Sequence, residues 1–352
     1  TQFVKYEAGS EEGVIGLLAS YLITDCSDEV KAYFEDLDIG NLSGESSVGE
    51  EELESIVKKL IRRENKTLII GEDLYGHENG TNIAKLVGLI DRYTDFNVVL
   101  IPSQTNTLGV SLICDLDDNV LDCKIVGYNE SGDFIISDNG TGNFQVPALN
   151  QQEGTFVSID KKVVNTNVAL PFDGYCLNDL VNKFIDKKMP NSIDYTSLLP
   201  IENGFKPISF DELKNGYDKY GNDLRGYFLT QRDIESTEFN IKDISDISTY
   251  NGTVIYRCEP LHQFNKNTGV SLQLQTNTSL RGSAGFAIAA KIKDGDTVDI
   301  IYGNQITRKA FKIDTTIKGT IALYPTFDDG ITNDTISSQY RFKQVQIKKV
   351  DA

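Results

Sequence analysis

Residues 67–101 read TLIIGEDLYGHENGTNIAKLVGLIDRYTDFNVVLI, and this stretch decides the fold class. Residues 67–70 and 97–101 are short apolar runs, which is typical of buried strands. Between them a glycine-rich loop, residues 71–80, leads into a segment with apolar residues on one helical face, at Ile83, Leu86, Val87 and Ile90. A strand, a helix and a second strand in this order predict a βαβ unit with parallel strands. We therefore expect an α/β domain with a parallel, Rossmann-like sheet that includes this unit, at about residues 66–102.

Two helices are predicted before this unit. Apolar residues recur at helical spacing in residues 9–24, with Ser10, Glu11 and Glu12 as a cap and an acidic first turn. A Gly/Ser-rich stretch, residues 40–49, then leads into the capping-box pattern Ser47-x-x-Glu50 and a second helical stripe. Acids begin this second helix and bases end it, which is the order that the helix dipole favours. The helix dipole therefore explains this charge pattern, and no bound ligand is needed to account for it.

The second half of the chain changes character after about residue 204. From residue 252 onward, short β-rich runs alternate with turn residues, and Asp294-Gly-Asp296 is typical of a tight turn that enters a strand. We predict an α/β domain over residues 1–205, a connecting segment over 206–250 and a mainly β domain, a small barrel, over 251–352. The expected strands of the barrel are residues 253–257, 271–274, 297–302, 310–313, 320–324 and 341–347.

Charge and composition limit the partners. The chain has 34 Lys and Arg against 52 Asp and Glu, a formal charge of −18, which repels phosphate backbones and anionic headgroups. Nucleic acid is therefore not an expected partner. No apolar run approaches the roughly 20 residues of a membrane span, so no direct membrane insertion is expected. The five cysteines are scattered and form no C-x-x-C pair, which favours a reducing compartment such as the cytoplasm.

The glycine-rich loop stands where nucleotide-binding folds carry a phosphate loop. His77 and Glu78 occupy the positions at which a phosphate loop has Lys and Ser or Thr, and Glu72, Asp73 and Glu78 would repel a pyrophosphate. We favour a turn that uses the backbone freedom of glycine, with a nucleotide-binding module as an alternative.

Other motifs also have simple structural explanations. Asp115-x-Asp117-x-Asn119 lacks the glycine and glutamate of a calcium loop, so a hairpin turn is expected. Cys114 and Cys123 cannot hold an iron–sulfur cluster by themselves, and we expect both to be buried packing groups. The two histidines, His77 and His262, lie in different predicted domains. The sequence thus assigns no catalytic, cofactor-binding or metal-ligating residue.

Longer strings resemble the molybdopterin oxidoreductase superfamily in its complex I branch. They are residues 68–74 (LIIGEDL) with Gly76-His77, 82–86 (NIAKL), 101–102 (IP) and 105–109 (TNTLG). More specific is the run 147–157 (PALNQQEGTFV), followed by 160–164 (DKKVV) and 166–171 (TNVALP). This run is similar to the Glu-x-Gly-Thr-Phe-Val-Asn signature in the form found in the large iron–sulfur subunit of NADH:quinone oxidoreductase. Glu153 directly precedes Gly154 here, and Ser158 replaces the usual Asn.

The resemblance continues in the β domain. Residues 252–257 (GTVIYR), Gln263-Phe264, Leu280-x-Gly282-Ser283, Ala287 and 294–298 (DGDTV) resemble the C-terminal double-psi β-barrel of the same superfamily. Since the first residue is Thr1 and the cysteine-rich cluster domains have no counterpart here, the resemblance implies a C-terminal segment of the large iron–sulfur subunit.

The resemblance implies a structural, non-catalytic role within an NADH dehydrogenase that passes electrons to quinone. Iron–sulfur clusters are expected in the N-terminal part of the full subunit, and no cofactor in this segment, because the complex I branch has lost the pterin. The expected partners are other subunits of the peripheral arm of bacterial respiratory complex I, on the cytoplasmic face of the inner membrane. An alternative is the C-terminal part of a molybdopterin-dependent oxidoreductase such as a formate dehydrogenase, with a pterin guanine dinucleotide between its domains.

Overall fold

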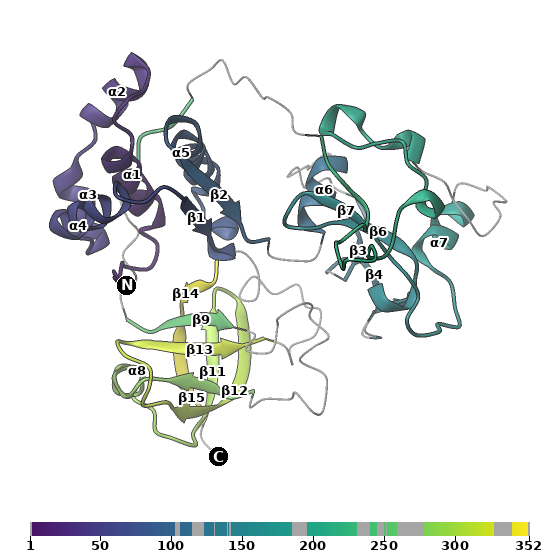
Figure 1. Ribbon diagram of the computed structural model, residues 1–352. Helices are drawn as coiled ribbons and strands as arrows, with labels where there is room; N and C mark the ends of the chain where they lie inside the picture. Colours follow the sequence, from purple (N-terminus) through teal and green to yellow (C-terminus); the bar gives the residue numbers. More distant parts are fainter. Residues whose placement is uncertain are drawn as a thin grey trace.

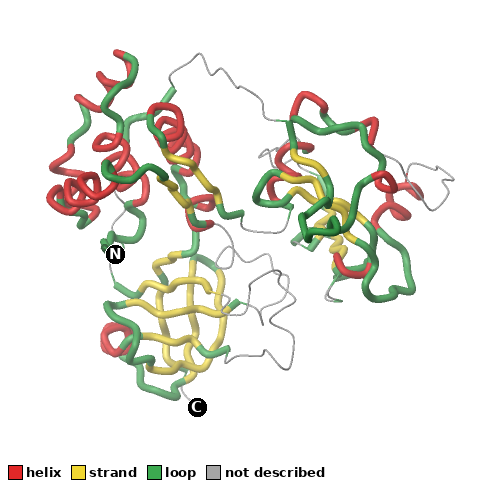
Figure 2. The backbone as a smooth tube through the Cα atoms, viewed as in Figure 1, coloured by secondary structure: helices red, strands yellow, loops and turns green. Residues whose placement is uncertain are grey.

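The computed structural model describes residues 2–102, 106–114, 123–129, 131–138, 140, 142–184, 196–230, 240–244, 250, 252–258, 278–326 and 340–350. The chain is a mixed α/β protein with small parallel sheets and a strongly curled, seven-stranded sheet in its C-terminal part (Figure 1). Figure 2 shows the helices concentrated in the first lobe and the longest strands in the curled sheet. None of the described helices is long and apolar enough to cross a membrane.

The first lobe contains the predicted βαβ unit. Strands β1 (Lys66–Ile70) and β2 (Phe96–Leu100) pair in parallel, with Lys66 opposite Phe96 and Ile70 opposite Leu100. Between them lie the 3₁₀ turn η1 (Glu72–Gly76) and helix α5 (Gly80–Tyr93). The predicted apolar face of α5 is buried against β1, β2 and the first helix of the chain. The βαβ prediction is confirmed, in a sheet that has two strands among the described residues.

Four helices precede the unit, and two of them were predicted. These helices are α1 (Glu11–Leu22), α2 (Asp28–Glu35), α3 (Ile39–Ser46) and α4 (Glu50–Leu60). The interpretation of residues 40–49 as a Gly/Ser-rich connection is wrong for most of its length, because α3 occupies it. The predicted capping box at Ser47 is wrong as well. Ser47 adopts a left-handed conformation with φ 59°, and α4 is instead capped at Gly49, whose N–H donates to the Glu52 carboxylate at 3.2 Å.

A second lobe spans residues 106–230. Its described elements are α6 (Thr107–Ile113), β3 (Val126–Tyr128), β4 (Phe134–Ser137), β5 (Phe144–Gln145), η2 (Leu149–Gln151), β6 (Gly154–Val157), β7 (Lys162–Thr166), α7 (Leu177–Phe184), η3 (Thr196–Leu198), η4 (Ile201–Asn203), η5 (Phe210–Glu212) and β8 (Tyr227–Phe228). Strands β6, β7 and β8 form an antiparallel sheet, over a small core that includes Val157, Val163 and Phe205.

The other sheet of this lobe, β3-β4-β5, is parallel although its strands follow one another closely in the chain. Parallel strands usually require a crossover of a dozen residues or more. Here a Gly-Asp/Asn-Phe sequence occurs twice, at residues 132–134 and 142–144. In each copy the Asp or Asn side chain accepts a backbone N–H from the preceding segment: Asp133 from Ile125 and Asn143 from Ile135, both at 2.8 Å. These side-chain hydrogen bonds stabilise the short connections between the parallel strands.

The curled sheet forms the C-terminal lobe. Its strands are β9 (Val254–Cys258), β10 (Leu280–Gly282), β11 (Thr297–Tyr302), β12 (Gln305–Ile313), β13 (Ile321–Pro325), β14 (Phe342–Gln344) and β15 (Gln346–Lys349). They lie in the order β14-β9-β13-β10-β12-β11-β15, and the pairs β9/β13 and β10/β12 are parallel. Alternate side chains and helix α8 (Ala284–Ala290) fill the concave side with an apolar core, whose fully buried members include Ile255, Leu280, Phe286, Val298, Phe311 and Tyr324.

Most of the expected strands of this lobe are confirmed. The predicted strand 341–347 is divided into β14 and β15 at Val345, whose N–H donates to the carbonyl of Thr253 at 3.0 Å. The turn at Asp294-Gly-Asp296 is confirmed: Gly295 has φ 84°, which favours glycine, and Asp296 accepts the N–H of Lys293 at 2.8 Å. The predicted strand 271–274 and the Asp115–Asn119 turn lie outside the described residues.

Candidate functional site at the joint between two lobes

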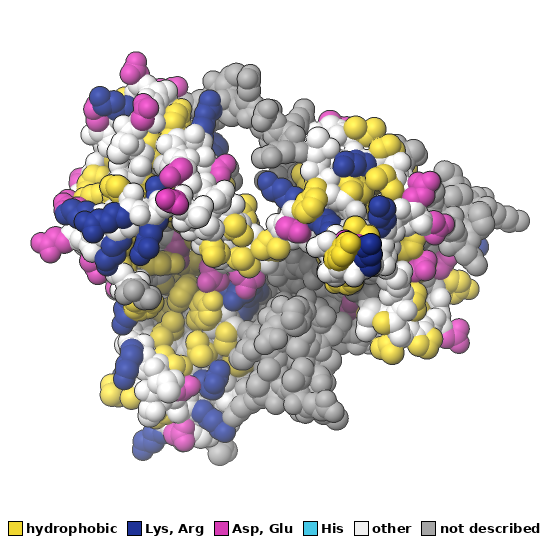
Figure 3. Space-filling view, in the orientation of Figure 1, with side chains coloured by type: hydrophobic (Ala, Val, Ile, Leu, Met, Phe, Trp, Pro, Cys, Tyr) yellow, Lys and Arg dark blue, Asp and Glu magenta, His cyan; other side chains and the backbone are white. Residues whose placement is uncertain are grey.

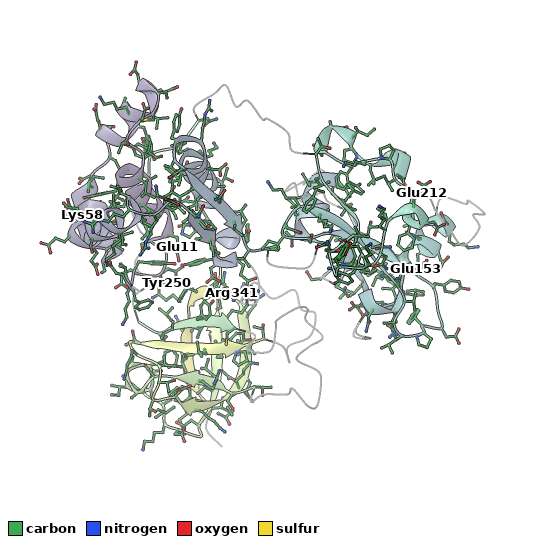
Figure 4. The ribbon with its side chains drawn as sticks, in the orientation of Figure 1. Glu11, Lys58, Glu153, Glu212, Tyr250 and Arg341 are labelled. Atoms are coloured by element: carbon green, nitrogen blue, oxygen red, sulfur yellow. The ribbon has the colours of Figure 1, made fainter. Side chains whose placement is uncertain are left out.

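The first lobe and the curled sheet meet at a polar joint. The first lobe contributes the start of α1, the turn η1 and the loop that follows it, and the curled sheet contributes β9 and the residues just before β14. Figure 4 labels Glu11, Tyr250 and Arg341 in this region, between the two lobes. We use "the joint" for Glu11, Glu72, Asp73 and His77 on one side and Tyr256, Tyr340 and Arg341 on the other.

Arg341 is the central cation of the joint. Its Nε lies 3.1 Å from Asp73 Oδ1, and its guanidinium also pairs with the carboxylate of Glu72. Nη1 donates to the Tyr256 hydroxyl at 3.2 Å, and that hydroxyl donates to Asp73 Oδ2 at 3.2 Å. The planar guanidinium suits this arrangement because its five N–H groups diverge in one plane. Two consecutive acids at the end of β1 are therefore held by one arginine of the curled sheet.

Burial sets the protonation behaviour around Arg341. Partial burial raises the pKa of Asp73, although its hydrogen bond from Tyr256 and the charge of Arg257 oppose this rise. Burial also lowers the pKa of the Arg341 guanidinium. For Tyr256, burial and then the Asp73 carboxylate raise the pKa of the phenol far above its ordinary value. The phenol therefore stays protonated and serves as a donor to Asp73.

Glu11 lies in a buried part of the joint. Its Oε1 accepts a hydrogen bond of 2.5 Å from the Tyr340 hydroxyl, which itself accepts the N–H of Gly9 at 2.8 Å. Its Oε2 is buried and has no hydrogen-bond partner among the described residues. Nε2 of His77 lies 3.5 Å from this oxygen and 3.3 Å from the carbonyl of Gly9.

The imidazole of His77 is oriented by its other nitrogen. Nδ1 accepts the N–H of Asn79 at 3.0 Å, so the hydrogen-bond network assigns the ring proton to Nε2. The ring of His77 also packs edge-on against Tyr340, with 5.2 Å between the centroids. His77 thus links the loop after β1, the start of α1 and the curled sheet, a role that its sequence context did not reveal.

A second buried carboxylate, Glu12, connects α1 to α5. It accepts hydrogen bonds of 2.7 Å from the side-chain amides of both Asn79 and Asn82. Asn82 also donates to the carbonyl of Lys242 at 2.9 Å and accepts the Lys242 N–H at 2.9 Å. Asn82 therefore ties the returning segment 240–244 to the two helices. The predicted role of Glu11 and Glu12 as a first-turn charge is incomplete, because both are almost fully buried in polar networks.

The glycine-rich loop at residues 71–80 differs from its predicted role. Gly71 has φ −76°, and none of the loop's glycines belongs to the positive-φ residues of the chain. The turn therefore does not depend on glycine's left-handed conformations, and that prediction is wrong. Its acidic residues Glu72 and Asp73 are committed to Arg341 instead. An anionic phosphate placed at this loop would meet two carboxylates.

Other predicted features lie away from the joint. Cys114 and Cys123 are exposed, so the prediction that both are buried is wrong. Cys114 is the C-cap of the short helix α6. His262 lies outside the described residues. Within the described ranges, no three His, Cys, Asp or Glu side chains converge on a point that could hold a metal ion.

Alkaline pH is expected to destabilise the joint. Burial and the Glu11 carboxylate raise the pKa of Tyr340 well above its ordinary value, and Tyr256 behaves in the same way beside Asp73. In the unfolded chain both phenols titrate near pH 10. Above that pH the unfolded state releases protons that the folded state retains, so the free energy of unfolding should fall as the pH rises toward the raised pKa values.

Urea unfolding from about pH 8 to about pH 11 measures this effect. Tyr340→Phe should reduce the loss of stability over that interval, because one raised pKa is removed. Tyr220→Phe is the matched control, since Tyr220 is 77% exposed. Equal pH dependence in the two variants would contradict the assignment to Tyr340.

None of the protein-family models matches this chain. A search of the curated proteins found no match either. The residues of the joint and the motif strings of the sequence are therefore what points to a function.

Proposed function

We propose that this chain is a structural, non-catalytic C-terminal segment of the large iron–sulfur subunit of NADH:quinone oxidoreductase, the respiratory complex I. In this role it holds a place in the peripheral arm on the cytoplasmic face of the inner membrane, and it contacts neighbouring subunits. Electron transfer takes place through clusters in the N-terminal part of the full subunit. The segment itself supplies no catalytic residue.

The joint is the observation that carries this proposal. In a βαβ unit, the loop after the first strand is the usual position of a phosphate or dinucleotide. Here Glu72 and Asp73 from that loop bind Arg341 of the curled sheet, and His77 packs on Tyr340. The loop that holds a phosphate in nucleotide-binding folds thus contacts the curled sheet here. This supports a fold that retains the superfamily's arrangement without its pterin.

Two of the resembling strings contact each other in the second lobe. Oδ1 of Asn106, from the string TNTLG, accepts the N–H of Val157, from the string EGTFV, at 2.9 Å. Gly109 of the first string lies so close to Asn106 and Val157 that a Cβ atom there would collide with the Asn106 carboxamide. The contact between the two strings thus explains why position 106 has an asparagine and position 109 a glycine. Their contact supports the proposal that both strings derive from one family.

The curled sheet supports the finer part of the fold proposal, a double-psi-like barrel. It mixes the parallel pairs β9/β13 and β10/β12 with antiparallel neighbours, and it encloses a single apolar core. Simple meander barrels contain antiparallel pairs alone. A mixed, curled sheet therefore agrees better with the superfamily's barrel than with a meander.

The isolated chain is expected to be colourless and free of stoichiometric pterin or nucleotide. The test uses visible absorption of the chain, together with metal analysis and chemical release of pterin and nucleotide from the full-length subunit. In the full-length subunit, iron and sulfide should be present, and molybdenum, tungsten and pterin absent. Stoichiometric pterin would favour the formate dehydrogenase alternative, and a stoichiometric nucleotide without pterin would favour the nucleotide-binding module.

A further inference from the structure

Basic side chains gather at the end of α4, on a chain whose formal charge is −18. Lys58, Lys59, Arg62 and Arg63 are exposed, and together with Glu51, Glu54 and Ser55 they line a shallow groove of about 870 Å³. Figure 3 shows Lys and Arg atoms (dark blue) together on this side of the first lobe, where Figure 4 labels Lys58. We call Lys58, Arg62 and Arg63, with Ile61, the basic shelf.

The helix dipole accounts for only part of this cluster. Lys58 and Lys59 lie in the last turn of α4, where a cation is favourable, but Arg62 and Arg63 lie beyond its C-cap at Ile61. Lys58 already pairs with Glu54 at 2.9 Å, and Lys59 contacts the side chain of Gln2. The two arginines therefore need an explanation other than helix stability.

Arg62 and Arg63 form no ion pair or side-chain hydrogen bond with the rest of the described chain. Other arginines find acids: Arg225 pairs with Asp223, and Arg308 with Asp299. Acids outnumber bases by 52 to 34, so carboxylates are plentiful within the chain. Two adjacent arginines that point to solvent are thus available to carboxylates from outside.

We propose that the basic shelf binds an acidic segment of a partner protein. The guanidinium groups of Arg62 and Arg63 hold its carboxylates, because the planar fork of arginine matches a carboxylate with two parallel hydrogen bonds. Ile61, which is 71% exposed, supplies an apolar contact beside the charges. This binding does not depend on which complex the chain belongs to.

A short acidic segment fits the shelf better than an extended anionic surface does. The N-terminal half of α4 carries Glu50, Glu51, Glu52 and Glu54, and two of these, Glu51 and Glu54, line the groove beside the basic side chains, whereas Arg62 and Arg63 lie beyond the end of the helix. Electrostatic interactions between exposed charges decay over roughly 8–10 Å at physiological salt. A short peptide can place its carboxylates on Arg62 and Arg63 alone, whereas a membrane or a nucleic-acid duplex would also bring its phosphates close to the glutamates of α4.

The test measures binding of a fluorescein-labelled decaglutamate peptide to the whole chain by fluorescence anisotropy. The wild type should bind at about 0.05 M salt and lose affinity at about 0.3 M. R62E/R63E should weaken binding roughly tenfold or more, because reversed charges repel the peptide. K312E/K318E is the matched control, since Lys312 is exposed on β12, Lys318 is exposed in the connection between β12 and β13, and the net charge changes equally. It should alter the affinity by less than about twofold.

Three results would overturn the proposal: no peptide binding by the wild type, equal weakening in both double variants, or tighter arginine-dependent binding to phosphatidylglycerol vesicles than to the peptide. Circular dichroism should show unchanged folding in R62Q/R63Q, a milder second variant, because both side chains are exposed and neither forms an ion pair or side-chain hydrogen bond with the rest of the described chain. Peptide binding by a chain whose full-length subunit contains pterin would leave this proposal intact and contradict the proposed function instead.

Discussion

Arg341→Ala should lower the free energy of unfolding of the joint by about 2–3 kcal/mol, because two carboxylates lose their shared cation. Glu72 and Asp73 are only 29% and 35% exposed, so solvent replaces the lost contact incompletely. The hydroxyl of Tyr256 also loses its donor. Amide hydrogen exchange in η1, β9 and β14 measures the effect as faster local opening, and urea unfolding measures the change in overall stability.

Arg308→Ala is the matched control for this experiment. Arg308 also pairs with an aspartate, Asp299, at 2.7 Å, but its side chain is 61% exposed. Solvent replaces such an exposed contact more completely, so Arg308→Ala should change the stability less than Arg341→Ala does. Arg341→Lys should fall between the wild type and Arg341→Ala, because a single ammonium group cannot make the same set of divergent hydrogen bonds. Similar losses for Arg308→Ala and Arg341→Ala would show that the joint is no more than a surface contact.

Asn82→Ala should destabilise the first lobe by about 3 kcal/mol, because it leaves several buried polar groups unsatisfied. The side chain of Asn82 is buried and makes hydrogen bonds to Glu12 and to both backbone groups of Lys242. Its loss should also release the segment 240–244 from α1 and α5. Thermal unfolding and hydrogen exchange at Lys242 and its neighbours measure the two effects.

Asn97→Ala provides the control for Asn82. Asn97 is exposed and makes a single weak bond of 3.4 Å to the carbonyl of Lys66, so its replacement should change stability by less than about 0.5 kcal/mol. Asn82→Asp is a sharper variant, since it keeps the shape of the side chain but faces Glu12 with a second carboxylate. It should cost at least as much as Asn82→Ala at neutral pH. A cost no greater than that of Asn97→Ala would mean that water replaces the network.

The sequence by itself determined the local elements. The apolar spacing of residues 67–101 predicted β1, α5, β2 and the parallel pairing of the two strands. The hydrophobic period of each element is visible in its own residues, and a helix between two strands of one sheet makes those strands parallel. Most strands of the curled sheet and the turn at Gly295 were predicted for the same reason, whereas β10 and the first half of β12 were not predicted. Where the local signals competed, prediction failed. Ser47 and Gly49 both suit a helix cap, and only the Glu52 carboxylate distinguishes them in the folded chain.

Only the tertiary structure decided what the polar residues do. The sequence predicted that the acids at residues 72 and 73 would repel a phosphate, but it did not reveal their partner Arg341, which lies far away in the sequence. The same holds for Glu11 with Tyr340, and for Asn82 with Lys242. Hydrophobic periodicity reports which face of an element is buried, but not which charged group will meet it there. A joint between lobes is built from such distant pairs, so it becomes visible only when the chain is folded.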